Sequence, residues 1–295
     1  MPLPTLKLRA GSPAAGTSTR LSGLGLGLLL THLPGPAAAV ELQVADGQRS
    51  IQAEVLGEGQ PLVLIPSLGR GAQDFDDLKQ RLRAAGYQII LPQPRGIAGS
   101  RGALTDLTLN DLAEDVHLVV SRVTERPVVV IGHAFGNRVA RTFATRYPER
   151  TRGVVLLAAG GATPIPPTVA KALRDSFRTE LPDAEHMAAV HLAFFADRND
   201  PAVWRDGWYP QVAQYQEAAN HATPRNSWWS GGTAPLLVIQ AVEDRVAPQD
   251  NARQLQAAFP QRVQVQLLAN AGHAMLPEQP QAIATQILQW LAQHR

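Results

Sequence analysis

The chain has 295 residues, of which 45% are hydrophobic and 18% charged, so it can bury a large core and we do not expect it to be disordered. Its formal net charge is +2, and the first 39 residues contain three basic residues and no acid, which leaves the remainder close to neutral. A neutral body has no basic surface for nucleic acid, so we expect no nucleic-acid partner. The absence of cysteine excludes disulfides, cysteine-ligated metal sites and a thiol nucleophile.

Residues 1–39 have the pattern of an export signal. A basic start is followed by the apolar stretch 21–30 and by the small residues 37–39, so the sequence predicts cleavage before Val40. The apolar stretch is shorter than the roughly 18 residues that a membrane-spanning helix needs, and no stable membrane span is expected. We therefore predict a periplasmic or secreted protein, and the alternative is a cytoplasmic protein that begins with an irregular tail.

Short apolar runs alternate with stretches of helical periodicity after Val40. In chain order, the predicted strands are 42–44, 51–55, 61–66, 88–91, 128–131, 154–157, 236–239 and 263–268. Predicted helices include one with an apolar stripe from Leu109 to Val120, one from Phe135 that stops before Pro148, and a last one from Pro280. Runs that are apolar on both faces are typical of a parallel sheet covered by helices on each side. The pattern predicts an α/β fold with a mostly parallel sheet and with sites at the carboxyl ends of its strands.

The stretch from about 162 to 230 breaks this alternation because it contains no convincing strand. Helical pieces are expected at 169–177 and 185–196. Four of the five tryptophans lie in this stretch: Trp204, Trp208, Trp228 and Trp229. We predict a helical lid over the end of the sheet, with these rings as candidate substrate-binding residues around an apolar pocket. The alternative is that each ring packs the lid onto the body.

The segment 128–137 combines a strand, a tight turn and a helix. The turn reads Gly132-His133-Ala134-Phe135-Gly136, with a glycine two residues on either side of its centre. This segment resembles the nucleophile elbow of the α/β-hydrolase superfamily, in which Gly-x-nucleophile-x-Gly joins a strand to a helix. The glycines are needed because the turn is so tight that larger side chains would collide with the strand and the helix. At the centre, where the family carries serine, this chain has Ala134, whose methyl group cannot attack a carbonyl.

Two further residues match the family pattern, and the resemblance extends over nearly the whole chain after residue 39. Asp244 follows the apolar run 236–239 and matches the family's acid, and His273 follows the last predicted strand and matches the family's base. The resemblance implies that the backbone N–H groups of Leu68 and Phe135 form an oxyanion hole. It also implies a small-molecule substrate with a carbonyl group, such as an apolar ester or lactone.

Ala134 leaves four interpretations open. An original serine was replaced by engineering in an ordinary serine esterase, or His273 and Asp244 activate water without a covalent intermediate. In the third, Ser67 on the predicted oxyanion loop is an alternative nucleophile. In the fourth, the protein is a catalytically inactive binder of small molecules. The presence of both the acid and the histidine favours an enzyme.

The remaining histidines and glycine-rich segments are not expected to hold a cofactor. We expect His133 to pack beside the strand end or to form a local hydrogen bond. His186 and His191 are five residues apart and have no acidic partner at the spacing of metal ligands, so no metal site is predicted. Gly57-Glu58-Gly59 lacks the rest of a dinucleotide-binding fingerprint.

Overall fold

A computed structural model describes residues 39–294. The predicted export signal therefore lies outside the described residues, apart from Ala39. Within the described part, eight strands form one sheet in the order β1-β2-β4-β3-β5-β6-β7-β8. The strands are β1 (Val40–Ala45), β2 (Ser50–Leu56), β3 (Gln60–Ile65), β4 (Tyr87–Pro92), β5 (Val128–His133), β6 (Thr151–Leu157), β7 (Leu236–Ala241) and β8 (Val263–Leu268). Every predicted strand is present, with ends that differ by at most three residues.

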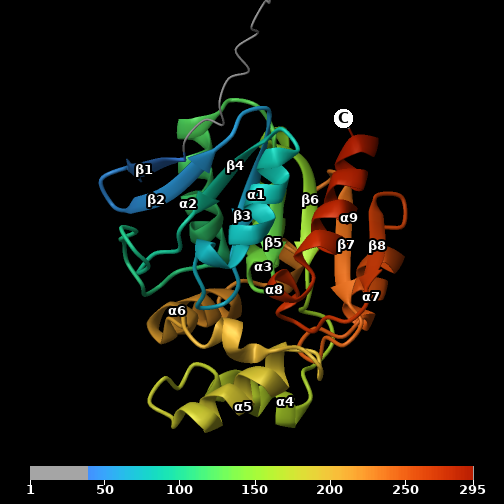
Figure 1. Cartoon of the computed structure of the whole chain (residues 1–295). Helices are drawn as coiled ribbons and strands as arrows, with labels where there is room; N and C mark the ends of the chain where they lie inside the picture. Colours follow the sequence, from blue (N-terminus) through green and yellow to red (C-terminus); the bar gives the residue numbers. More distant parts are fainter. Residues whose placement is uncertain (1–38, 295) are drawn as a thin grey trace, which may run out of the picture. The chain divides into compact units, whose positions relative to one another are not determined.

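The sheet is mostly parallel, as predicted (Figure 1). Strands β3 to β8 run in one direction, whereas β2 is antiparallel to both of its neighbours. All six residues of β5 and of β7 are buried, which agrees with strands covered on both faces. The carboxyl ends of the parallel strands lie at the lower edge of the sheet in Figure 1.

Helices cover the two faces of the sheet, because consecutive strand residues point to opposite faces and both sets are apolar. On one face, Val63 and Val130 pack with α2 (Leu109–Val123), α3 (Gly136–Arg146) and α7 (Asp250–Ala258). On the other face, Leu62 and Ile131 pack with α1 (Asp76–Ala84) and α9 (Pro280–Gln293). Two separate apolar cores thus hold β5 and β3 rigidly, and both strands lead into the candidate site.

The chain between β6 and β7 contains no strand, and we call residues 158–235 the helical insertion. It holds α4 (Pro167–Asp175), α5 (Asp183–Phe194) and α6 (Pro210–His221). These helices lie beside the carboxyl ends of the parallel strands (Figure 1). Helix α6 is fastened to the loop after β3, since Gln216 Oε1 accepts the N–H of Gly69 at 2.8 Å and Gly69 O accepts the N–H of Tyr209 at 2.9 Å.

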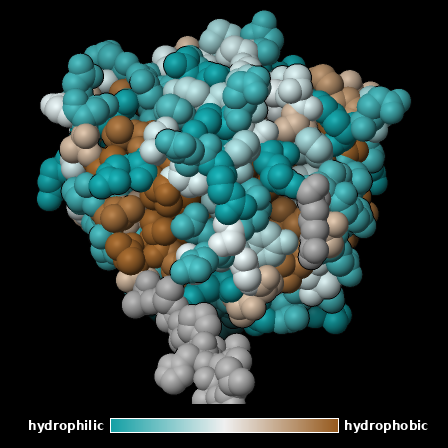
Figure 2. Space-filling view, turned by 90° about the horizontal axis from the view of Figure 1, so that it is seen from above, coloured by the Kyte–Doolittle hydropathy of each residue, from teal (hydrophilic) through white to brown (hydrophobic). Residues whose placement is uncertain are grey.

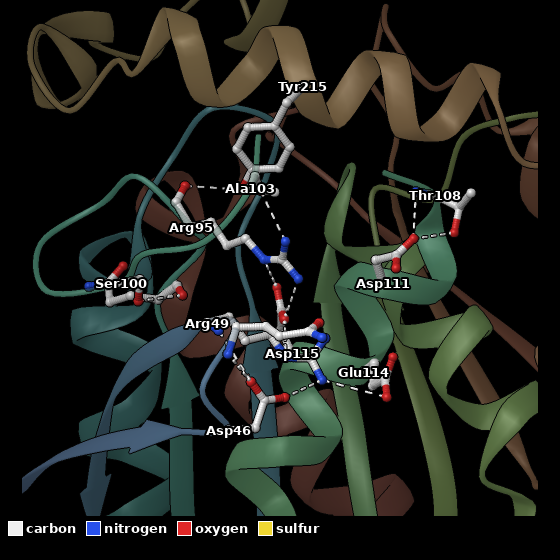
Figure 3. A network of polar contacts seen from close by, with 12 residues as sticks. Asp46, Arg49, Arg95, Ser100, Ala103, Thr108, Asp111, Glu114, Asp115 and Tyr215 are labelled. Atoms are coloured by element: carbon white, nitrogen blue, oxygen red, sulfur yellow. Dashed lines mark hydrogen bonds and ion pairs between the residues drawn. The ribbon is translucent and has the colours of Figure 1, made fainter. Parts of the chain in front are cut away.

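A buried polar network holds the loop that follows β4 (Figure 3). Arg95 donates from Nε and Nη2 to the two carboxylate oxygens of Asp115, at 2.7 and 2.8 Å. The hydroxyl of Tyr215, on α6, donates to Arg95 O at 3.1 Å, and Arg49 Nε lies 3.3 Å from Asp115 Oδ1. Ser100 Oγ donates to the carbonyl oxygen of Gln93, at the start of the loop, at 3.0 Å. These bonds give the loop a structural role.

The end of the sheet opposite to the helical insertion carries a mainly hydrophilic surface, with hydrophobic residues gathered in patches (Figure 2). Exposed large hydrophobic residues among those described include Val40 on β1 and Leu267 on β8. In the described part of the chain, no helix combines the length and the apolar character that crossing a membrane requires.

Candidate active site

The turn between β5 and α3 has the backbone of a strained elbow. Ala134 has a φ of 49°, in the left-handed region that L-residues other than Asn and Asp rarely adopt. Its N–H donates to Leu157 O at 2.9 Å, and its carbonyl accepts the N–H of Asn137 at 3.1 Å. These bonds hold the side chain of residue 134 at the carboxyl end of the central strand, at the start of α3.

The two flanking glycines are required by close backbone approach. A Cβ atom on Gly132 would lie 2.6 Å from the Cα of Asn137, and one on Gly136 would lie 2.6 Å from the carbonyl oxygen of Pro66. Real Cβ atoms do not approach backbone atoms so closely. The motif Gly-x-Ala-x-Gly therefore follows from packing between β5, α3 and the loop after β3, whatever residue occupies its centre.

Asp244 and His273 form a buried pair beside the elbow. Nδ1 of His273 lies 2.9 Å from Oδ2 and 3.0 Å from Oδ1 of Asp244, and the two residues are 5% and 6% exposed. Asp244 Oδ1 also accepts the backbone N–H groups of Val246 and Ala247 at 3.0 and 2.7 Å. Asp244 thereby fixes the imidazole through Nδ1, which leaves Nε2 as the nitrogen without a partner among residues 39–294.

His133 forms a hydrogen bond to the backbone of His273, one member of this pair. Its Nε2 lies 2.8 Å from the carbonyl oxygen of His273, and its ring packs edge-on against Trp204. Burial lowers the pKa of His133 to about 3, so the ring is neutral at physiological pH and Nε2–H donates to the carbonyl. Its Nδ1 has no partner in the described part of the chain. His133 thus packs and hydrogen-bonds, as expected, and it holds the backbone of His273.

A cavity of about 440 Å³ brings the predicted site residues together. Its wall is formed by the loop after β3, the elbow, the helical insertion and the loops that carry the acid and the histidine. Of the predicted residues, it is lined by Ser67, Leu68, Ala134, Phe135 and His273. The N–H groups of Leu68 and Phe135 donate to no group among residues 39–294. Two unpaired amides beside one cavity are what an oxyanion hole requires.

The four tryptophans of the insertion are not among the residues that line this cavity, so their contact with a substrate stays a prediction. Trp204 and Trp208 are 3% and 8% exposed, and their rings pack against each other and over the guanidinium of Arg70, whose Cζ is 4.3 and 4.7 Å from the ring centres. Trp228 and Trp229 pack edge to face and both contact the guanidinium of Arg141. Each pair of rings therefore packs around a buried arginine.

Two arginines of α3 were missed in the sequence. Arg138 lines the cavity, and Arg141 is fully buried against the rings of Trp228 and Trp229, with Cζ 4.6 and 4.7 Å from the ring centres. The available signal was their position in the chain, since both arginines lie in the first two turns of the helix that follows the elbow.

The chain is similar to known proteins over most of its length. The alpha/beta hydrolase family profile matches residues 62–286. A monoacylglycerol lipase of Mycolicibacterium smegmatis is 24% identical over 248 residues, which cover 79% of this chain and 88% of the lipase. A 2-hydroxy-6-oxononadienedioate/2-hydroxy-6-oxononatrienedioate hydrolase of Cupriavidus pinatubonensis is 25% identical, covering 87% of this chain and 96% of that protein. Among solved structures, an esterase from Exiguobacterium antarcticum superposes with a TM-score of 0.73 at 18% identity, covering 86% of this chain and all of that one.

Proposed function

The chain belongs to the alpha/beta hydrolase family, and from this premise we propose that it hydrolyses a small, largely apolar ester, lactone or related carbonyl compound without a serine nucleophile. The relatives named above are a lipase and a hydrolase of a keto acid, which are both enzymes that act on carbonyl compounds. The observation that carries the proposal is the buried pair of His273 and Asp244 in a cavity that also holds two unpaired amides.

The proposed reaction uses water as the nucleophile. Nε2 of His273 accepts a proton from a water molecule as the oxygen of that water attacks the substrate carbonyl, and Asp244 stays ionised and stabilises the imidazolium. The N–H groups of Leu68 and Phe135 donate to the oxyanion that forms. When the tetrahedral intermediate collapses, the imidazolium returns its proton to the leaving alkoxide, so acid and alcohol are released and His273 is neutral again.

Ala134 sets the expected rate. Removing the nucleophile from a serine hydrolase leaves residual catalysis from the oxyanion hole and the binding site, roughly 10³- to 10⁴-fold over water. We therefore expect slow turnover by this chain. We also take the helical insertion to act as a lid, since α4, α5 and α6 each contribute residues to the cavity wall.

The test compares hydrolysis of p-nitrophenyl butyrate by the chain as it stands, by His273→Ala and by Ala134→Ser. We expect slow turnover that His273→Ala abolishes and that Ala134→Ser raises by roughly 10³-fold or more. His221→Ala is the matched control, because His221 lines the same cavity and has no bond to Asp244. Ser67→Ala distinguishes attack by water from attack by Ser67. The rate stays unchanged if water attacks, and it falls if Ser67 is the nucleophile. Turnover that survives His273→Ala removes the histidine from the mechanism.

A second candidate function is the binding of a small molecule without catalysis. It is favoured by the methyl group of Ala134, which lies at the position of the family's nucleophile and lines a cavity of about 440 Å³. If the chain as it stands gives no turnover and Ala134→Ser does, the proposed water mechanism is wrong. Either the catalytic serine has then been lost in a binding protein, or it has been replaced in an ordinary esterase.

A further inference from the structure

Arg138 places an unpaired positive charge in the cavity. It lies on α3 and lines the cavity together with Ala134 and His273. Among residues 39–294, its Nε is shielded from solvent and has no hydrogen-bond partner, and no carboxylate oxygen lies within 4.0 Å of its guanidinium. Its guanidinium carbon is 5.9 Å from the ring centre of Trp228, which is at the limit of a cation–π contact.

Arg141, one turn further along the same helix, shows how this protein satisfies an arginine that is purely structural. Its Nη2 donates to Asn137 Oδ1 at 2.6 Å and to Gly160 O at 3.0 Å. The rings of Trp228 and Trp229 both contact its guanidinium. All three guanidinium nitrogens of Arg141 thus have partners in its own chain, whereas the guanidinium of Arg138 has donors left over for a group that enters the cavity.

The energetic cost of this arrangement is visible in the pKa of Arg138. Burial lowers that pKa to about 10, so the guanidinium is still protonated at neutral pH but is held in an unfavourable environment. Glu217 lies on the same cavity wall and favours the charged form, yet its side chain is exposed and forms no ion pair with Arg138. Arg138 as a whole is half-buried and has no bonded anion among residues 39–294, and the cavity of about 440 Å³ has room for one.

We propose that Arg138 binds a carboxylate of the substrate, so that the preferred ligand is a carbonyl compound with an apolar body and an acidic end. This inference rests on the proposed function for the identity of the cavity, and it adds the chemical class of the substrate. A planar guanidinium matches the two oxygens of a carboxylate. Arg138 and Ala134 line the same cavity, so a substrate that reaches both residues holds its acid and its reacting carbonyl within that cavity.

The binding test uses hexanoate and hexanamide, which have the same shape and differ in charge. Calorimetric titration of the full chain should show that hexanoate binds roughly tenfold or more tightly than hexanamide, which corresponds to one charge-assisted hydrogen-bonded pair. Arg138→Gln should bring the two affinities within about twofold of each other, and Arg138→Lys should restore part of the preference for the acid.

Arg146→Gln is the matched control, because Arg146 lies exposed on the same helix and the substitution removes the same charge. It should leave the preference for hexanoate intact. Equal affinities in the unsubstituted chain, a preference that survives Arg138→Gln, or no binding of hexanoate at millimolar concentration each overturn the proposal. Unfolding curves of Arg138→Gln check that this variant is folded. If Arg138→Gln does not fold, the reduced preference for hexanoate in Arg138→Lys serves as the test.

A kinetic arm separates this proposal from the proposed function. In the Ala134→Ser background, Arg138→Gln should lower kcat/KM for the mono-p-nitrophenyl ester of adipic acid through KM, and by at least roughly fivefold more than it lowers kcat/KM for p-nitrophenyl butyrate, about the loss of one charge-assisted hydrogen bond. The calorimetric result needs no turnover. A preference for hexanoate in a chain without hydrolytic activity would therefore sustain the carboxylate site and overturn only the hydrolase.

Discussion

Ala134 keeps the strained backbone of a nucleophile elbow although it has no nucleophile. A left-handed conformation costs an L-residue roughly 1–2 kcal/mol, and alanine at φ 49° gains no hydroxyl chemistry in return. The strain is sustained by the hydrogen bond from the N–H of Ala134 to Leu157 O and by the packing of the glycines around it. Restoring a hydroxyl at residue 134 therefore needs no change of backbone, which is why Ala134→Ser is an informative variant.

The first stability prediction concerns Gly136. Gly136→Ala puts a Cβ atom 2.6 Å from the carbonyl oxygen of Pro66, so β3 and α3 must move apart. We expect a loss of roughly 1–3 kcal/mol in the free energy of unfolding, measured by urea denaturation. Gly160→Ala is the control, since its Cβ would make an ordinary contact of 3.4 Å with the side chain of Ala247. Similar losses in both variants would show that close approach at the elbow is not the cause.

At the scale of elements, Arg70 connects the loop after β3 to the helical insertion. Its Nε and Nη2 donate to the two oxygens of Asp74 at 2.8 and 2.7 Å, and its Nη1 donates to Asp206 O at 2.9 Å. Arg70 also lies under the rings of Trp204 and Trp208. One buried cation thus holds the segment that follows the candidate oxyanion amide against the insertion that forms the cavity wall.

Breaking this connection should be costly. Arg70→Met leaves the carboxylate of Asp74, which is 2% exposed and whose pKa is raised by burial, without its partner. We expect a loss of roughly 3–5 kcal/mol in the free energy of unfolding, and less in the double variant with Asp74→Leu. Lys171→Met removes a comparable but exposed partner of Asp175 and should cost under about 1 kcal/mol. Equal costs for the two single variants would contradict the buried connection.

The elements of the fold were predictable from the sequence because their signals are local. Apolar runs marked all eight strands, and the apolar stripe from Leu109 to Val120 marked α2, which begins at Leu109. The family motif located the elbow, and the strand ends located the acid and histidine. Helices α1, α6 and α7 were not identified, since their apolar stripes are short.

The contacts between elements were not predictable. The tryptophans were assigned to a pocket because aromatic residues in an insertion often line one, whereas Trp204 and Trp208 pack with Phe194 and Arg70. Arg138 was overlooked because a sequence does not reveal that an arginine lacks a partner. That property depends on the distances between the guanidinium and the carboxylates of the folded chain. The carboxylate that shares the cavity wall, that of Glu217, is 79 residues away in sequence.

For the whole molecule, His133 predicts a loss of stability in acid. Its folded pKa is about 3 and its ordinary value is 6.5, so between these pH values the unfolded chain binds a proton that the folded chain does not. The free energy of unfolding therefore falls as pH decreases below 6.5, by up to about 1.4 kcal/mol per pH unit from this group. Burial raises the pKa of Asp115, which acts in the opposite direction, so a comparison of variants is needed to isolate the histidine.

His133→Gln retains a donor for the carbonyl of His273 and cannot titrate. Between about pH 7 and about pH 5, the free energy of unfolding of the unsubstituted chain should fall by about 2 kcal/mol more than that of His133→Gln. His221→Gln removes a histidine from the exposed surface of α6 and should keep the steeper dependence of the unsubstituted chain. Parallel curves for the unsubstituted chain and His133→Gln would mean that His133 is protonated inside the fold. In that case, the neutral state of the His133 ring, which donates to the carbonyl of His273, would be wrong.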